Sequence, residues 1–198
     1  MDTNEFLHPD IKVHVLPGGH APERKTDGAI GYDARIRAVV SDREMDTANP
    51  ILRKTLFDFE AWPDDPSISG HVVSKVRQNG HELIYRIDPG QSVMLGLGFF
   101  TAMPFPMFYW VAPRSGFASK HKITITNAPG TIDPDYRGEA GALIHNRGED
   151  PFDLSRSMRI VQVIFQWALI PQIEFVDHPE KLGETTRGTG GFGSTGVS

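Results

Sequence analysis

Cysteine is absent from the 198 residues, and basic residues are fewer than acidic ones, with 20 Lys and Arg against 25 Asp and Glu. A chain without cysteine can form neither disulfides nor thiolate metal sites, which fits a reducing compartment. The formal net charge of −5 provides no broad basic surface for duplex nucleic acid. We therefore expect no nucleic-acid partner, and an anionic ligand would have to be bound by local groups.

The sequence also has no long hydrophobic run. Nowhere does it approach the ~18 consecutive apolar residues that a membrane helix requires. Its start, MDTNEFLHPDIKV, lacks the basic residues and apolar stretch of a secretory leader. These absences predict a single soluble domain with a cytoplasmic (intracellular) location and no membrane partner.

Glycine and proline are frequent, with 20 and 15 residues, and they separate short runs rich in β-branched and aromatic residues. This spacing is typical of an all-β protein, and Pro-Gly pairs at 17–18, 89–90 and 129–130 provide turns. We predict a jelly-roll or distorted β-barrel. The expected strands span residues 34–40, 83–87, 92–97, 107–112, 122–126, 141–145 and 159–166.

One segment departs from the β pattern. Asn49 is a suitable N-cap and Pro50 a suitable first helical residue, and apolar residues follow at helical spacing in ILRKTLFDFEAW. We predict a short helix over 51–62, within an insertion of about 42–80 in the β scaffold. Residues 1–183 would form the β domain with this insertion, and the apolar-poor residues 184–198 a mobile, glycine-rich C-terminal arm.

Two internal segments carry polar groups that could act on a ligand. In APRSGFASKH (112–121), the arginine, the serine hydroxyl and the backbone N–H groups could bind an anion, or the segment could be an ordinary loop. The turn-rich NAPGTIDPDYRGEAG (127–141) predicts a hairpin. Its Asp133 and Asp135 could cap backbone amides, or Asp133 could deprotonate a water while Tyr136 packs on a ring.

The C-terminal RGTGGFGSTG (187–196) also has two interpretations. It matches G-x-G-x-x-G, but only five residues follow Gly193, so the helix of a dinucleotide-binding fingerprint is missing. It is either a flexible linker or a segment that closes over a ligand. The eight histidines are scattered without a metal-binding spacing, so we expect no direct protein metal site.

Five segments in this order resemble the motifs of the trimeric dUTP diphosphatase (dUTPase) family. They are IGYDARI (30–36), APRSGFASKH (112–121), NAPGTIDPDYRGEAG (127–141), RIVQVIF (159–165) and RGTGGFGSTG (187–196). The resemblance implies hydrolysis of dUTP to dUMP and pyrophosphate, which limits uracil incorporation into DNA and supplies dUMP for thymidylate synthesis. It also implies a homotrimer, in which the first, second and fourth motifs come from one subunit, the third from another and the tail from the third.

The resemblance also assigns the chemistry. Asp133 would be the base that activates a water for attack at the α-phosphorus, and Gln162 would help to hold that water and the phosphates. The Mg²⁺ cofactor would be bound mainly by phosphates and water, with Asp33 contacting one of the waters. No direct protein ligand to the metal is implied.

Substrate contacts are implied for residues of the second, third and fifth motifs. Phosphates would meet the second motif and the tail, uracil would meet the third motif with Phe192 stacked on it, and Tyr136 would pack on deoxyribose. The implied substrate-binding residues are Arg114, Ser115, Gly116, Asn127, Gly130, Thr131, Ile132, Tyr136, Gly141, Arg187, Phe192, Gly193, Ser194 and Thr195.

Two alternatives stay open. The related dCTP deaminases use a glutamate where this chain has Leu143, and typically two serines where it has Ser115 and Gly116. A dUTPase-like trimer could also recognise a protein partner through residues 42–80, about which the resemblance says nothing. Ala34 replaces the leucine that is common in the first motif.

Overall fold

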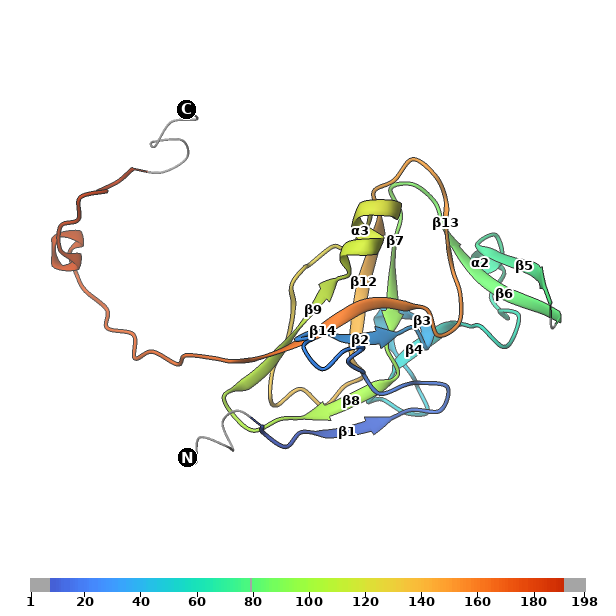
Figure 1. The fold of residues 1–198 in the computed structure, drawn as a ribbon, viewed down its shortest axis with the longest axis horizontal. Coiled ribbons are helices and arrows are strands. Elements are labelled where there is room, and N and C mark those ends of the chain that lie inside the picture. The colour runs from blue at the N-terminus through green and yellow to red at the C-terminus, as the bar shows by residue number, and fades with distance from the viewer. Residues whose placement is uncertain (1–7, 79, 191–198) are drawn as a thin grey trace. The chain divides into compact units, whose positions relative to one another are not determined.

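The structure of the protein, a computed structural model, describes residues 8–78 and 80–190 (Figure 1). Contacts within the chain divide it into a first unit, residues 1–168, and a second unit, residues 169–198. Among the described residues, no helix has the length and apolar character needed to cross a membrane.

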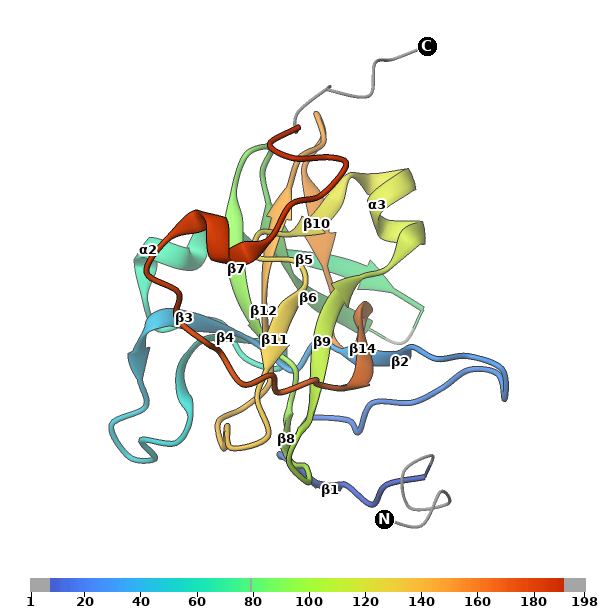
Figure 2. The same cartoon turned by 90° about the vertical axis from the view of Figure 1, so that its left-hand side faces the viewer.

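The first unit is built from antiparallel strands in two larger and two smaller sheets (Figures 1 and 2). The five-stranded sheet has the order β10 (Ile123–Ile125), β12 (Gly141–Asn146), β7 (Ser92–Gly96), β3 (Ala38–Met45) and β4 (Arg53–Asp58). The four-stranded sheet has the order β11 (Gly130–Ile132), β9 (Met107–Pro113), β14 (Arg159–Trp167) and β2 (Tyr32–Arg35).

Among the described residues of this unit, the smaller sheets are accompanied by two helices. One pairs β1 (Lys12–Val15) with β8 (Phe99–Ala102), and the other has the order β13 (Phe152–Leu154), β6 (Gly80–Ile87) and β5 (Val72–Arg77). The helices are α2 (Pro66–Ser69) and α3 (Ser115–His121). The all-β prediction is confirmed.

Both larger sheets contribute side chains to one apolar core. Along β12, residues alternate between half-buried and buried, so that Ala142 and Ile144 point inward. Leu95 of β7 and Val163 of β14 are fully buried in the same cluster. This period of two is what the sequence shows, because successive side chains of a strand point to opposite faces.

Two expected elements differ in the structure. The strand expected over 34–40 is two strands, because the chain leaves β2 after Arg35 and enters β3 of the other large sheet at Ala38. The helix expected over 51–62 is wrong: residues 53–58 form β4, which pairs with β3. Within it Phe57 is buried, as is Phe59 two residues later, so cross-strand pairing and core burial override the helical spacing.

The expected hairpin at 127–141 is present, but a long connection separates its two arms. Its antiparallel arms are β10 and β12, with Ile125 opposite Ile144. Between them the chain forms β11, which joins the other large sheet by pairing with β9. The connection therefore bridges the two large sheets, and Figure 2 shows β11 and β9 side by side.

Residues 42–80 extend from the scaffold strands. The first half of β3 is buried and its second half, from Asp42, is exposed. After β4 the chain forms the four-residue helix α2 and then β5, and β5 and β6 extend away from the larger sheets (Figure 1). Asp153 of β13 connects β5 and β6 to the rest of the unit, since it forms ion pairs with Lys75 of β5 and Arg86 of β6. Hydrogen bonds from Arg86 and then Lys75 oppose desolvation and hold the pKa of the Asp153 carboxyl below its usual range.

The described part of the second unit, residues 169–190, contains a single short 3-10 helix, Pro179–Leu182. Several of its large apolar side chains, such as Leu169 and Phe175, are almost fully exposed. The unit by itself thus buries little apolar surface. A boundary at residues 183 and 184 stays a prediction.

A buried ion pair fixes the segment after β11 to the core. Arg37 donates from Nε and NH2 to the two carboxylate oxygens of Glu139, each at 2.7 Å. Gly98 adds a backbone N–H at 2.8 Å to Glu139 Oε1. The Glu139 side chain is 2% exposed and that of Arg37 13%. Three donors therefore satisfy a carboxylate that would otherwise be costly to bury.

We predict that Glu139→Ala or Arg37→Ala lowers the free energy of unfolding by about 3–5 kcal/mol, since each leaves the other charge buried and unpaired. The double variant should be less destabilised than the sum of the two. Urea unfolding at fixed protein concentration measures all three. Arg43→Ala is the control, because its pair with Asp42 is exposed. A Glu139→Ala variant as stable as the unaltered protein would contradict the prediction.

Candidate functional site

Most third-motif residues surround one small pocket beside β11, called here the β11 pocket. Its volume is about 230 Å³. Of the predicted residues, Asn127, Gly130, Thr131, Ile132, Asp133, Tyr136 and Gly141 line it. Their assignment as substrate-binding residues stays a prediction. Pairing of β11 with β9 fixes the backbone of this wall, with Gly130 opposite Val111.

The Tyr136 ring is held against the backbone that follows it. Its hydroxyl donates to the carbonyl oxygen of Glu139 at 3.2 Å, and its N–H donates to the carbonyl oxygen of Asp133, also at 3.2 Å. Any side chain at Gly138 would collide with this ring, since an added Cβ would lie 2.3 Å from the hydroxyl oxygen. Glycine at 138 therefore lets the tyrosine fold over the turn.

Asp133 presents its carboxylate at the pocket. The residue is exposed, and within residues 8–78 and 80–190 no hydrogen bond or ion pair engages its side chain. Its backbone carbonyl shapes the turn, whereas both carboxylate oxygens can accept hydrogen bonds from water. A carboxylate in this state can serve as a general base.

Residues of the first, second and fourth motifs form a second group, called here the Arg114 cluster: Asp33, Arg114, Arg159 and Gln162. The Asp33 carboxylate forms an ion pair with Arg114, whose Nε lies 2.9 Å from Oδ1, and accepts a hydrogen bond from Arg159 NH1 at 3.1 Å. Arg114 NH1 donates to the Arg159 carbonyl at 2.5 Å. The guanidinium of Arg114 is thus oriented on two sides, and its NH2 group has no hydrogen-bond partner among the described residues.

Gln162 lies beside this network on the middle strand of β9, β14 and β2. It is opposite Asp33 on β2 and Ala112 on β9. Its Nε2 donates to the Pro113 carbonyl at 3.0 Å. Gly31 makes room for it, since a Cβ there would lie 2.2 Å from Gln162 Oε1. Backbone pairing and this close approach together set the orientation of the amide.

Ser115 and Gly116 directly follow the cluster as the first residues of α3. Both are exposed. The Arg114 carbonyl accepts from the N–H groups of Phe117 and Ala118. The hydroxyl of Ser115 and the backbone N–H groups of both residues are therefore available to an anion.

Within the described part of the first unit, the predicted residues fall into two separate groups. None of Arg114, Ser115, Gly116 and Gln162 lines the β11 pocket. Arg187 belongs to the second unit, where its Nε donates to the Gly190 carbonyl at 2.9 Å. Phe192, Gly193, Ser194 and Thr195 lie outside the described residues.

Several residues of the two groups were missed by the sequence predictions. Arg53, Met94, Val111 and Glu139 also line the β11 pocket, and Arg159 completes the Arg114 cluster. Glu139 and Arg159 stand inside the quoted motif segments, so they could have been named from their positions. Arg53 and Met94 lie on strands distant in the sequence, and no local pattern marks them.

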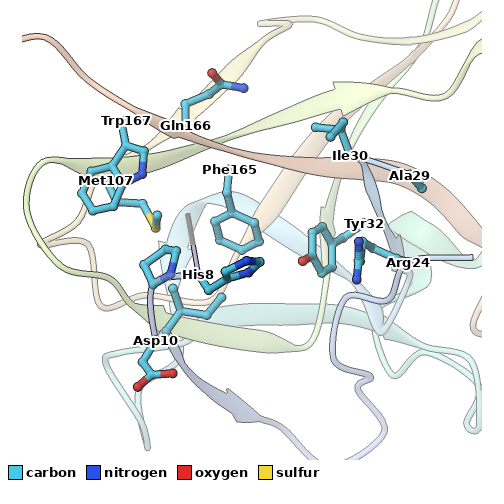
Figure 3. A pocket seen from close by; sticks show the side chains of 12 residues that line it. His8, Asp10, Arg24, Ala29, Ile30, Tyr32, Met107, Phe165, Gln166 and Trp167 are labelled. Atoms are coloured by element: carbon cyan, nitrogen blue, oxygen red, sulfur yellow. The ribbon is translucent and has the colours of Figure 1, made fainter. Parts of the chain in front are cut away.

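A larger cavity, about 590 Å³, contains none of the predicted residues. Figure 3 shows its lining, which includes His8, Arg24 and Tyr32. The Tyr32 ring meets that of Phe165 edge-on at 5.4 Å, and the Arg24 guanidinium lies 5.8 Å from the Tyr32 ring centroid. Size alone does not identify a reactive site, and the β11 pocket combines the unpaired carboxylate of Asp133 with the ordered backbone of β11.

The structure gives no sign of a metal cage in the part of the chain that it describes, where no three His, Asp or Glu residues cluster suitably. Asp33, the one residue predicted to reach a metal through water, has both carboxylate oxygens paired with arginines.

Comparison with known proteins identifies relatives of the whole chain. A family model described as dUTPase matches residues 83–196. A deoxyuridine 5'-triphosphate nucleotidohydrolase of Corynebacterium jeikeium is 39% identical over 168 residues, covering 84% of this chain and 96% of that protein. Another from Gloeothece citriformis is 43% identical over 112 residues, 57% of this chain and 75% of that protein.

Solved structures share the fold. The dUTPase of Staphylococcus bacteriophage 80alpha with dUPNHPP has a TM-score of 0.65 and 18% identity, over 96% of this chain and 99% of that chain. The dUTPase of phage phi11 of S. aureus has a TM-score of 0.58 over 86% of this chain and 98% of that chain, with 15% identity. The family model covers more than half of the chain, and the Corynebacterium relative is matched along nearly its whole length, so the chain belongs to the dUTPase family.

Proposed function

We propose that the protein hydrolyses dUTP to dUMP and pyrophosphate. The observation that carries this proposal is the β11 pocket, in which ordered backbone, an asparagine and a tyrosine surround space beside the unpaired carboxylate of Asp133. Family membership supports the same reaction. Such a pocket can hold a nucleoside while a base acts on the phosphate attached to it.

Asp133 takes a proton from a water molecule as that water attacks the α-phosphorus. A new P–O bond forms at the α-phosphorus, and the bond from it to the oxygen that bridges to the β-phosphorus breaks. Pyrophosphate leaves with the bonding electron pair, and dUMP retains the oxygen of water. Gln162, whose amide is held by its bond to Pro113, helps to position the water and phosphates.

The β11 backbone selects the base. Fixed N–H and C=O groups of Gly130 to Ile132 and the amide of Asn127 match the carbonyl oxygens and N3–H of uracil. Cytosine presents a reversed pattern at two of these positions and would leave buried polar groups unpaired. The closed turn excludes the methyl group of thymine, and Tyr136 occupies the space that a 2′-hydroxyl would need.

The phosphates bind at the Arg114 cluster and at the start of α3. The free NH2 edge of Arg114, the Ser115 hydroxyl and the Gly116 N–H form a set of donors for phosphate oxygens. Magnesium bound to the triphosphate would neutralise part of its charge. A solved dUTPase from phage phi11 is described with a structural Mg(II) ion, which supports the use of this metal.

A closed trimer completes the site. The β11 pocket and the Arg114 cluster are separate groups on one chain, so we infer that the pocket of one subunit meets the cluster of a second. The arm of a third subunit covers the ligand, with Phe192 on uracil and Arg187, Ser194 and Thr195 on phosphates. Deamination is not favoured, because Leu143 offers no base, and no observation favours a regulatory role in place of hydrolysis.

The first prediction concerns the base. Asp133→Asn should remove most turnover while dUTP still binds, because the proton transfer occurs in the transition state. Identification of products from each dNTP with Mg²⁺ should give dUMP and pyrophosphate from dUTP with the unaltered protein. Asp135→Asn is the matched control in the same turn. Near-normal kcat in Asp133→Asn, or release of ammonia or of dUDP, would refute the mechanism.

The second prediction concerns the shared site. Asp133→Asn and Arg114→Ala should each be inactive, but refolding them together at equal amounts should restore roughly a quarter of the activity, since a random trimer pairs an intact pocket with an intact cluster at that frequency. Light scattering should report three subunits. A fully active monomer, or no recovery in confirmed mixed trimers, would exclude a site shared between subunits.

The third prediction concerns the arm. Deletion of residues from 187 onward should strongly lower kcat while the trimer persists, because an arm that encloses the substrate excludes water and stabilises phosphate charge. Phe192→Ala should be milder, a loss of about 3- to 10-fold for one stacking contact. Steady-state kinetics and sizing of both variants check this. Unchanged kinetics in the truncated trimer would make the segment a linker.

A further inference from the structure

Arg53 places a cation at the β11 pocket. It belongs to the hairpin of β3 and β4, called here the inserted hairpin. It begins β4, outside every motif segment, yet its side chain lines the pocket together with Asn127, Asp133 and Tyr136. The β3–β4 pairing brings it there, with Arg53 opposite Met45. The inserted hairpin therefore reaches the proposed substrate site.

The contacts of Arg53 orient its guanidinium without neutralising it. NH1 donates to the carbonyl oxygens of Asp42 at 3.0 Å and Ser41 at 3.4 Å. In the described part of the chain, Arg53 has no ion pair and its Nε and NH2 groups have no hydrogen-bond partner. The residue is half-buried. By contrast Glu139, which also lines the pocket, is fully paired with Arg37.

The size of the pocket indicates which part of a nucleotide Arg53 meets. At about 230 Å³ the pocket is smaller than the ~300–1,000 Å³ typical of sites for drug-sized ligands. It suits a base with its sugar, whereas a triphosphate must extend beyond it. Uracil and deoxyribose both carry acceptor oxygens, and a half-buried cation with free donors gains from such a partner.

We propose that Arg53 is a further substrate-binding residue, which donates from its free guanidinium edge to an acceptor oxygen of the deoxyuridine moiety. The inserted hairpin is then part of the substrate site. The inference rests on the proposed function, because it takes the β11 pocket to be the nucleoside site. Its chemistry is directional hydrogen bonding from a cation whose orientation is fixed by two backbone carbonyls.

The test compares Arg53→Ala with Lys54→Ala. Lys54 is the next residue, pairs with Glu44 at 2.7 Å across the same hairpin and does not line the pocket. We expect Arg53→Ala to weaken binding of dUMP and of deoxyuridine by about tenfold or more, as for loss of a charged hydrogen bond, and to raise KM for dUTP more than it lowers kcat. Arg53→Lys should recover part of the affinity, and Lys54→Ala should bind as the unaltered protein does.

Calorimetric titration with dUMP, deoxyuridine and dUTP distinguishes the outcomes. Unchanged affinity in Arg53→Ala overturns the proposal, and so does an equal loss in Lys54→Ala, which would point to hairpin integrity. Loss confined to dUTP would place the contact on a phosphate and overturn the assignment to the nucleoside. If the unaltered protein hydrolyses dUTP and the Arg53→Ala variant binds the nucleosides normally, only the role of Arg53 is refuted. If the unaltered protein does not hydrolyse dUTP, the proposed function is refuted.

Discussion

The buried pair between Arg37 and Glu139 joins the core to the β11 pocket. Arg37 stands where the chain passes from one large sheet to the other, between β2 and β3. Glu139 lines the pocket, and its backbone carbonyl receives the Tyr136 hydroxyl. Gly98, between β7 and β8, supplies the third donor. The position of the tyrosine in the pocket thus depends on a charge pair that is satisfied only when both sheets are correctly assembled.

The sequence predicted the strands whose burial alternates, because that pattern is local. It failed where tertiary pairing overrides local preference. Asn49 and Pro50 resemble a helix start, yet the Asn49 carbonyl accepts from the Leu52 N–H in a turn, and Phe57 is buried in the core. The break between Arg35 and Ala38 was also missed, because a strand that changes sheets keeps a continuous apolar pattern.

The site was predicted to the extent that its residues stand in motif segments. The third-motif residues line one pocket because they share one turn and one strand. Arg53 could not be found this way, since its place at the pocket follows from the register of β3 with β4. The family model matches residues 83–196, so the position of residues 42–80 follows from their own contacts.

The fixed orientation of Arg114 has an entropic consequence. A free arginine side chain loses about 1.5–2 kcal/mol of rotamer entropy when a ligand immobilises it. Here Asp33 and the Arg159 carbonyl already hold the guanidinium, and the Phe117 ring lies 5.9 Å from its central carbon. That ordering is completed during folding, so an anion that met the NH2 edge would find a preorganised donor, and more of the contact energy would appear as affinity.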